Sequence, residues 1–165
     1  MKTWIQQSAV IACLLLTTGV VLAQGKPDPS EEKLKQLAQS AATLISGDKV
    51  AAFEKKLLVD RGRYNHYYKK QHDIEIADRG WTEFKDGIRE NFGKKKDAIE
   101  DPKLTFTRMQ FGQEGPFKTC ELWASFAAKA DKKEADAKAD PAPPQGELIV
   151  HFIRIKGKWV LVSLE

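Results

Sequence analysis

The chain has 165 residues, of which 42% are hydrophobic and 30% are charged. This length suits one globular domain with a core of its own, and the composition is ordinary for such a domain. The net charge is +4, and the densest basic runs, at Lys94–Lys96 and Lys132–Lys133, lie among acidic residues. Proteins that follow a phosphate backbone carry a concentrated basic stripe, so this mild charge balance argues against nucleic acid as a partner.

Residues 1–23 have the features of a secretory signal peptide. Lys2 supplies the positive end, an apolar run extends from Ala9 to Leu22, and Val21-Leu22-Ala23 places a cleavage site before Gln24. The run is short for a transmembrane span, and no second apolar stretch follows it. We therefore expect an exported protein, periplasmic or extracellular, that meets the membrane only before cleavage. The alternatives are an uncleaved N-terminal membrane anchor and lipidation at Cys13 in Val10-Ile11-Ala12-Cys13.

Removal of the signal peptide would leave Cys120 as the single cysteine, so no internal disulfide can form. Cys120 occupies an apolar position of a strand pattern. This position predicts a small buried residue rather than a nucleophile.

The mature chain begins with a linker at 24–30 and continues as a single domain over 31–165. Asp28, Pro29 and Glu31 are typical of a helix start, with Asp28 as the cap. Apolar residues at helical spacing follow, and Gly47 ends this first helix. Asp48 is expected to cap a second helix that runs to about Arg61-Gly62.

Residues 63–79 are rich in aromatic and basic side chains and give no clear period. Within them, residues 73–77 alternate in polarity, which predicts a short strand. After Gly80 the spacing of large apolar residues predicts a third helix, ended by Gly93, with an inner face made by Trp81, Phe84, Ile88 and Phe92.

The period then changes to two, which predicts strands at 104–111, 117–128, 148–155 and 159–164. Lys156-Gly157 is a hairpin turn, and the strands form an antiparallel meander. Residues 129–146 are charged and rich in Ala and Pro, so we expect a flexible loop inserted at one hairpin tip.

This order of elements resembles the nuclear-transport-factor-2-like superfamily, which includes ketosteroid isomerases and SnoaL-type cyclases. The resemblance is carried by Leu44-Ile45-Ser46-Gly47-Asp48, by Gly80-Trp81, and by the hairpin segment 152–160, Phe-Ile-Arg-Ile-Lys-Gly-Lys-Trp-Val. It implies an α+β fold in which a curved antiparallel sheet wraps about three N-terminal helices into a cone with an open pocket. Such a fold hosts many functions, so it does not by itself specify one.

The resemblance lets the isomerase site be tested by position. Counting from the shared motifs, the isomerase tyrosine falls near Ser40, its oxyanion aspartate on His151, and its base near Gln71, two residues from Asp73. Two of these three roles have the wrong residue, so the resemblance does not carry the isomerase activity over.

Candidate catalytic residues are nevertheless His151 and Asp73. His151 shares a strand face with Ile149, Ile153 and Ile155. If that face lines the cone, His151 is a polar group in an apolar pocket, suited to proton transfer or ligand contact. Asp73 would be its acid–base partner. His66 and His72 do not have metal-ligand spacing, so no metal and no cofactor are expected.

Aromatic residues are the other candidates for the pocket wall, since rings with polar tips suit ligand contact as well as the rim of a core. They are Tyr64, Tyr67, Tyr68, Trp81 and Trp123.

Three functions are compatible with these patterns. The first is binding of a small apolar ligand or a protein partner through the cone, without catalysis. The second is a SnoaL-like or isomerase-type enzyme that uses His151 and Asp73. The third is a module that forms homodimers through the convex sheet face, which would carry Leu148, Val150 and Phe152.

Overall fold

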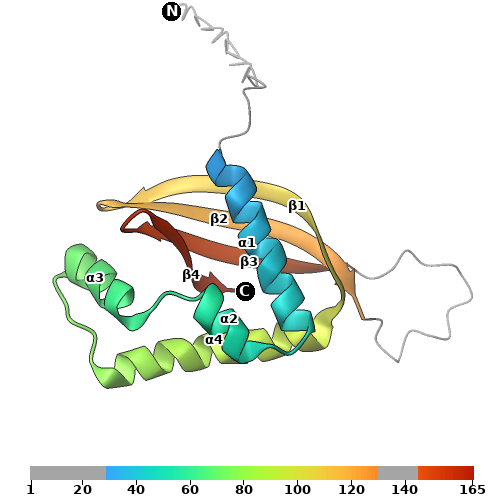
Figure 1. The fold of residues 1–165 in the computed structure, drawn as a ribbon, viewed down its shortest axis with the longest axis horizontal. Coiled ribbons are helices and arrows are strands. Elements are labelled where there is room, and N and C mark those ends of the chain that lie inside the picture. The colour runs from blue at the N-terminus through green and yellow to red at the C-terminus, as the bar shows by residue number, and fades with distance from the viewer. Residues whose placement is uncertain (1–28, 130–144) are drawn as a thin grey trace, which may run out of the picture.

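The structure, a computed structural model, describes residues 29–129 and 145–165, so the predicted signal peptide and the cap expected at Asp28 lie outside the described residues. Four helices precede a four-strand antiparallel sheet (Figure 1). The helices are α1 (Pro29–Ser46), α2 (Val50–Lys56), α3 (Arg61–His72) and α4 (Asp78–Ala98). The strands are β1 (Ile99–Glu114), β2 (Phe117–Ala128), β3 (Gln145–Ile155) and β4 (Lys158–Leu164). The sheet order β1-β2-β3-β4 confirms the α+β class and the predicted meander.

The main core lies between one face of the sheet and the helices α1, α2 and α4. Helix α1 contributes a stripe of fully buried residues at three- and four-residue spacing: Leu34, Ala38, Ala41, Ala42 and Ile45. Leu148, Val150 and Phe152 of β3 belong to this same core and are at most 2% exposed. The prediction that these three residues form a bare face for dimerisation is therefore wrong. Alternation along a strand separates two faces, but it does not say which one the helices cover.

A second core cluster forms on the opposite face of the sheet, at the end where the hairpins turn. Ile153 and Ile155 of β3 and Phe117 of β2 meet Tyr64 of α3 there. Figure 1 shows α3 lying at this end of the sheet. Helix α4 joins the two cores, because Ile88 and Phe92 lie in the first and Trp81 packs against the second.

The second helix does not extend to Gly62 as predicted, because Gly62 belongs to a separate helix, α3. Helix α2 ends at Lys56, and the next residues pair with the edge of β4. Val59 N donates to the carbonyl of Leu161 at 3.1 Å, and Leu161 N donates to the carbonyl of Leu57 at 2.9 Å. Asp60 then caps α3, with its carboxylate accepting a hydrogen bond from Arg63 N. The helical run is interrupted because residues 57–59 form hydrogen bonds with the edge strand β4.

The strand predicted at 73–77 is also wrong, because these residues form an irregular connection between α3 and α4. Ile74 is 57% exposed, so the alternation of this segment does not correspond to a buried face.

Helix α4 runs from Asp78 to Ala98 and includes Gly93, which was expected to end it. Asp48 has a φ of 54° and does not cap α2. Its carboxylate instead contacts Lys96 Nζ at 3.2 Å.

Three of the strands begin earlier than predicted, β2 matches its predicted bounds, and β1 also continues past Phe111 to Glu114. β1 begins at Ile99 rather than Leu104, and its pairing with β2 shifts register at three places along the bend that Figure 1 shows. β3 begins at Gln145, so the last two residues of the expected flexible loop are strand, while 130–144 lie outside the described residues. Within the described ranges, no helix is long and apolar enough to cross a membrane.

Candidate functional site

A row of polar side chains crosses all four strands at the level of His151. Strand register pairs Gln110 with Glu121, Glu121 with His151, and His151 with Ser163. Neighbours that are paired in this way project from the same face of a sheet. This face is opposite to the main core, which receives the alternate residues Leu122 and Val150. The four polar side chains line a pocket of about 350 Å³.

Helix α3 closes one side of this pocket through Tyr67. The ring of Tyr67 contacts Phe117 at a centroid distance of 5.3 Å, and its hydroxyl donates to Glu114 Oε2 at 2.5 Å. Burial, and then the hydrogen bond to Glu114, raise the pKa of Tyr67 above its ordinary value. The phenol therefore stays protonated at neutral pH and acts as a hydrogen-bond donor at the pocket wall.

His151 lies between two carboxylates. Its Nε2 atom is 3.3 Å from Oε1 of Glu121 and 3.7 Å from Oε1 of Glu165. Nε2 is shielded from solvent, but it makes no hydrogen bond of acceptable geometry within the described part of the chain. The imidazole as a whole is 32% exposed. The exposed part of the imidazole is therefore what a ligand can contact, while Nε2 itself lies against the two carboxylates.

The pocket is acidic. Its lining includes the carboxylates of Glu114, Glu121 and Glu165 and, within the part of the chain that the structure describes, neither lysine nor arginine. Sequence patterns predicted an apolar pocket around His151, whereas only four of the thirteen described residues that line it are apolar residues other than glycine or tyrosine: Cys120, Phe152, Ile153 and Val162. The expected role of Cys120 is confirmed, because the residue is 1% exposed and burial, then the charges of Glu31 and Glu121, raise the pKa of its thiol to about 12. The pocket therefore offers hydrogen-bond acceptors and donors but no reactive thiolate.

Asp73 is not brought to this pocket. It ends α3 in the left-handed conformation with a φ of 54°, its backbone N–H donates to Lys69 O, and it is exposed. His66 and His72 pack beside aromatic rings instead of facing His151, with centroid distances of 6.0 Å from His66 to Phe117 and 5.2 Å from His72 to Tyr68. Residues 29–129 and 145–165 contain no group of three or more side chains able to hold a metal ion.

The predicted aromatic wall divides among several places. Tyr67 lines the pocket, whereas Tyr64 and Tyr68 belong to the second core cluster, where their ring centroids are 4.9 Å apart. Trp81 packs against the same cluster and lines a different pocket. Trp123 stands one row along the sheet from His151 and lies under the guanidinium of Arg108, 4.5 Å from the ring centroid. Only Tyr67 and His151 of the predicted pocket residues thus meet in one site.

The residues that sequence reasoning missed are the carboxylates beside His151. Glu121 alternates with buried Cys120 and Leu122, which marks it as a residue of the other strand face. Its pairing with His151 depends on strand register across a connection longer than fifteen residues, which the sequence does not specify. Glu165 adds to the site because its backbone pairs with Ile149, with both hydrogen bonds between 2.8 and 2.9 Å.

Comparisons of this chain with known protein families, with curated proteins and with solved structures give no match. The α+β architecture is therefore established from the structure, without a family assignment.

Proposed function

We propose that the chain is an exported ligand-binding domain with a fold of the nuclear-transport-factor-2-like type, and that the His151 pocket binds a small polar molecule. The order of elements supports the fold proposal: helices first, then a four-strand meander. The observation that carries the function is the row of polar side chains, one from each strand, inside a pocket whose volume suits a small ligand.

The chemistry of the lining favours a neutral or positively charged ligand over an anion. Glu114, Glu121 and Glu165 would repel an anion, while their oxygens accept hydrogen bonds from hydroxyl or ammonium groups. Tyr67 contributes an aromatic face at the rim, and its hydroxyl, which donates to Glu114, can still accept a hydrogen bond. For this reason the proposal replaces the apolar ligand expected from the sequence with a polar one.

The test is ligand-observed NMR on the mature domain, with three probe sets: small amines, neutral polyols and small carboxylates. We expect members of the first two sets to bind and the carboxylates to fail. Binding should be lost in Glu121→Gln and kept in Glu100→Gln, an exposed position of β1 that lies outside the pocket lining. Equal binding to both variants, or no binding from any set at millimolar concentration, would refute the proposal.

Proton transfer by His151 is the second candidate, and the 3.3 Å separation of its Nε2 from Glu121 favours it. A carboxylate at this distance can orient an imidazole and stabilise its charged form during a reaction. The partner in this version is Glu121, since Asp73 does not line the pocket. Each probe that binds would be incubated with stoichiometric wild-type domain and with His151→Asn. Conversion by the wild type alone supports catalysis, and recovery of every bound probe unchanged contradicts it.

Formation of a homodimer stays a prediction, but the surface first assigned to it is buried. The mass of the purified domain in solution tests it directly, and a monomer at high concentration would count against it.

A further inference from the structure

A second pocket, of about 590 Å³, lies between the amino-terminal helices and the β3–β4 hairpin. Its walls come from α2, the connection at 57–60, the first turns of α3 and α4, and the start of β4. The two sides are fixed to each other by backbone hydrogen bonds, since Val59 and Leu57 pair with Leu161. A pocket with walls held in this way exists before any ligand arrives, which lowers the entropic cost of binding.

The lining of this pocket is strongly basic. Six of its fourteen residues are cations: Lys55, Lys56, Arg61, Arg63, Lys85 and Lys158. Only Glu54 and Asp60 are carboxylates. This charge is opposite to that of the His151 pocket, so the two pockets would not take the same ligand.

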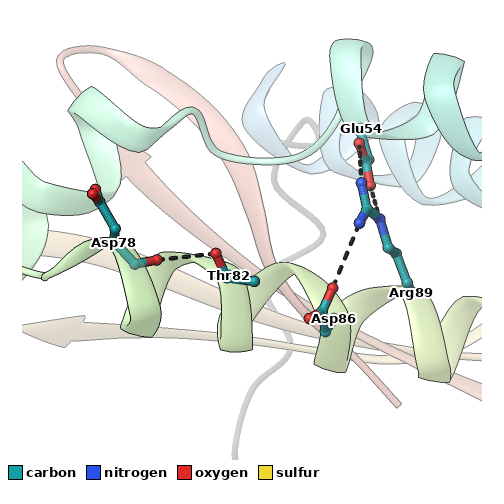
Figure 2. A network of polar contacts seen from close by, with 5 residues as sticks. All are labelled: Glu54, Asp78, Thr82, Asp86 and Arg89. Carbon is teal, nitrogen blue, oxygen red and sulfur yellow. Dashed lines mark hydrogen bonds and ion pairs between the residues drawn. The ribbon is translucent and has the colours of Figure 1, made fainter.

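Both carboxylates of the lining are already engaged by arginines. Figure 2 shows Arg89 of α4 reaching Glu54 of α2, where Arg89 Nε and Nη2 donate to the two carboxylate oxygens at 2.6 and 3.3 Å. Arg89 lies outside the pocket lining, so it neutralises Glu54 without using a cation of the pocket. Asp60 is bound to the guanidinium of Arg63 and also accepts from Arg63 N at 2.9 Å.

The lysines, in contrast, are not compensated. Among the described residues, Lys55, Lys56, Lys85 and Lys158 have no carboxylate partner. The two arginines of the lining are already paired, Arg61 with Asp78 and Arg63 with Asp60. Like charges gathered in a partly enclosed pocket repel one another, and a bound anion relieves that repulsion.

Two tryptophans are among the residues that line this pocket. Trp81 is held against Phe84 in a stacked arrangement, with centroids 5.3 Å apart, and Lys85 Nζ lies 5.7 Å from the Trp81 ring centroid. Trp159, at the start of β4, is partly exposed, and its ring centroid lies 6.3 Å from that of Phe111. Indole faces beside ammonium groups suit a ligand that combines a ring with negative charge.

We propose that this pocket binds a small organic anion with two or more negative charges, as carboxylate, phosphate or sulfate groups, on a ring-shaped body. The lysines bind the charged groups, and Trp159 and Trp81 contact the ring. This site is separate from the His151 pocket, so the test of one pocket's ligand neither supports nor refutes the ligand proposed for the other.

The test is titration of the mature domain with trimesate, a benzene tricarboxylate, followed by tryptophan fluorescence. Citrate supplies similar charge without the ring, and benzyl alcohol supplies the ring without charge. We expect trimesate to bind more tightly than citrate, benzyl alcohol not to bind, and added salt to weaken binding. The double variant Lys85→Gln/Lys158→Gln should raise the trimesate Kd by about tenfold or more. Trp159→Leu should reduce trimesate affinity to that of citrate.

The control is Lys33→Gln/Lys103→Gln, which removes the same charge from exposed positions of α1 and β1 outside the pocket. Its Kd should stay within about twofold of the wild-type value, because distant surface charges are screened. Equal losses in the two double variants would show general attraction to a basic protein and would overturn the proposal. So would the absence of any fluorescence change with trimesate at millimolar concentration. Thermal melting of each variant verifies that it is folded before its Kd is compared.

Discussion

Replacement of Gly93 by alanine tests whether α4 really continues past this residue. The sequence predicts Gly93 as the end of a helix, a position where a left-handed glycine is common and alanine is costly. In the structure Gly93 lies inside α4, and a Cβ built on it meets no atom within 4 Å beyond the helix's own backbone. The substitution therefore adds no steric term, and only the difference in helix propensity remains.

Alanine is favoured over glycine inside a helix by about 0.8–1.0 kcal/mol, so Gly93→Ala should raise the free energy of unfolding by about 1 kcal/mol. This corresponds to an increase in Tm of about 2–4 °C for a domain of this size. Urea denaturation followed by circular dichroism measures the change. Gly157→Ala is the matched comparison, because Gly157 has a φ of 79° in the β3–β4 turn and alanine there should cost about 1 kcal/mol. Destabilisation by Gly93→Ala of similar size would refute the continuous helix and restore the sequence-based boundary.

Three further outcomes follow from packing and ionisation. Gly146→Ala should destabilise the domain by about 1–3 kcal/mol in the same urea assay, because its Cβ would overlap the ring of Phe126, which is 3% exposed; unchanged stability would contradict the pairing of these two residues. The free energy of unfolding should fall as the pH rises through 10, because burial first, then hydrogen bonding, raises the pKa of Tyr64 and Tyr67 above 10.0, so these phenols ionise there only in the unfolded chain. The raised pKa of Cys120 adds to this fall from about pH 9. In Tyr67→Phe that alkaline fall should be shallower, and an identical pH profile would contradict the cause given. Iodoacetamide should alkylate Cys120 slowly in the native domain at pH 8 and rapidly in urea, since burial raises the thiol pKa to about 12; mass spectrometry measures both rates, and equal rates would be inconsistent with a buried thiol.

Patterns of neighbouring residues were enough to predict the four strands and the α+β class. The second strand, 117–128, matches β2 at both ends, and the turn at Lys156-Gly157 joins β3 and β4 as expected. These elements are specified by alternation and turn chemistry, which act between neighbours along the chain. Helix α1 could be predicted for the same reason, because its buried residues recur at three- and four-residue spacing and Gly47 lies just beyond its end.

Helix α3 shows where such patterns fail. Its side chains are mostly aromatic and basic, so no single apolar stripe marks it, and Tyr64 is the only one of its residues that is buried. It forms because Asp60 caps its start and because tyrosines cover the second core cluster on the far side of the sheet. Both the cap and that surface depend on the pairing of Leu57–Val59 with β4, which the local sequence pattern does not reveal.

The amino-acid sequence by itself determined the α+β class, the order of the strands and the burial of Cys120, because each depends on residues close together in the chain. Only the tertiary structure decided which sheet face the helices cover, and so moved Leu148, Val150 and Phe152 from the surface to the core. It also placed Glu121 and Glu165 beside His151 and left Asp73 outside the pocket. Contacts of this kind depend on strand register and on the packing of α3, which short-range periodicity does not encode.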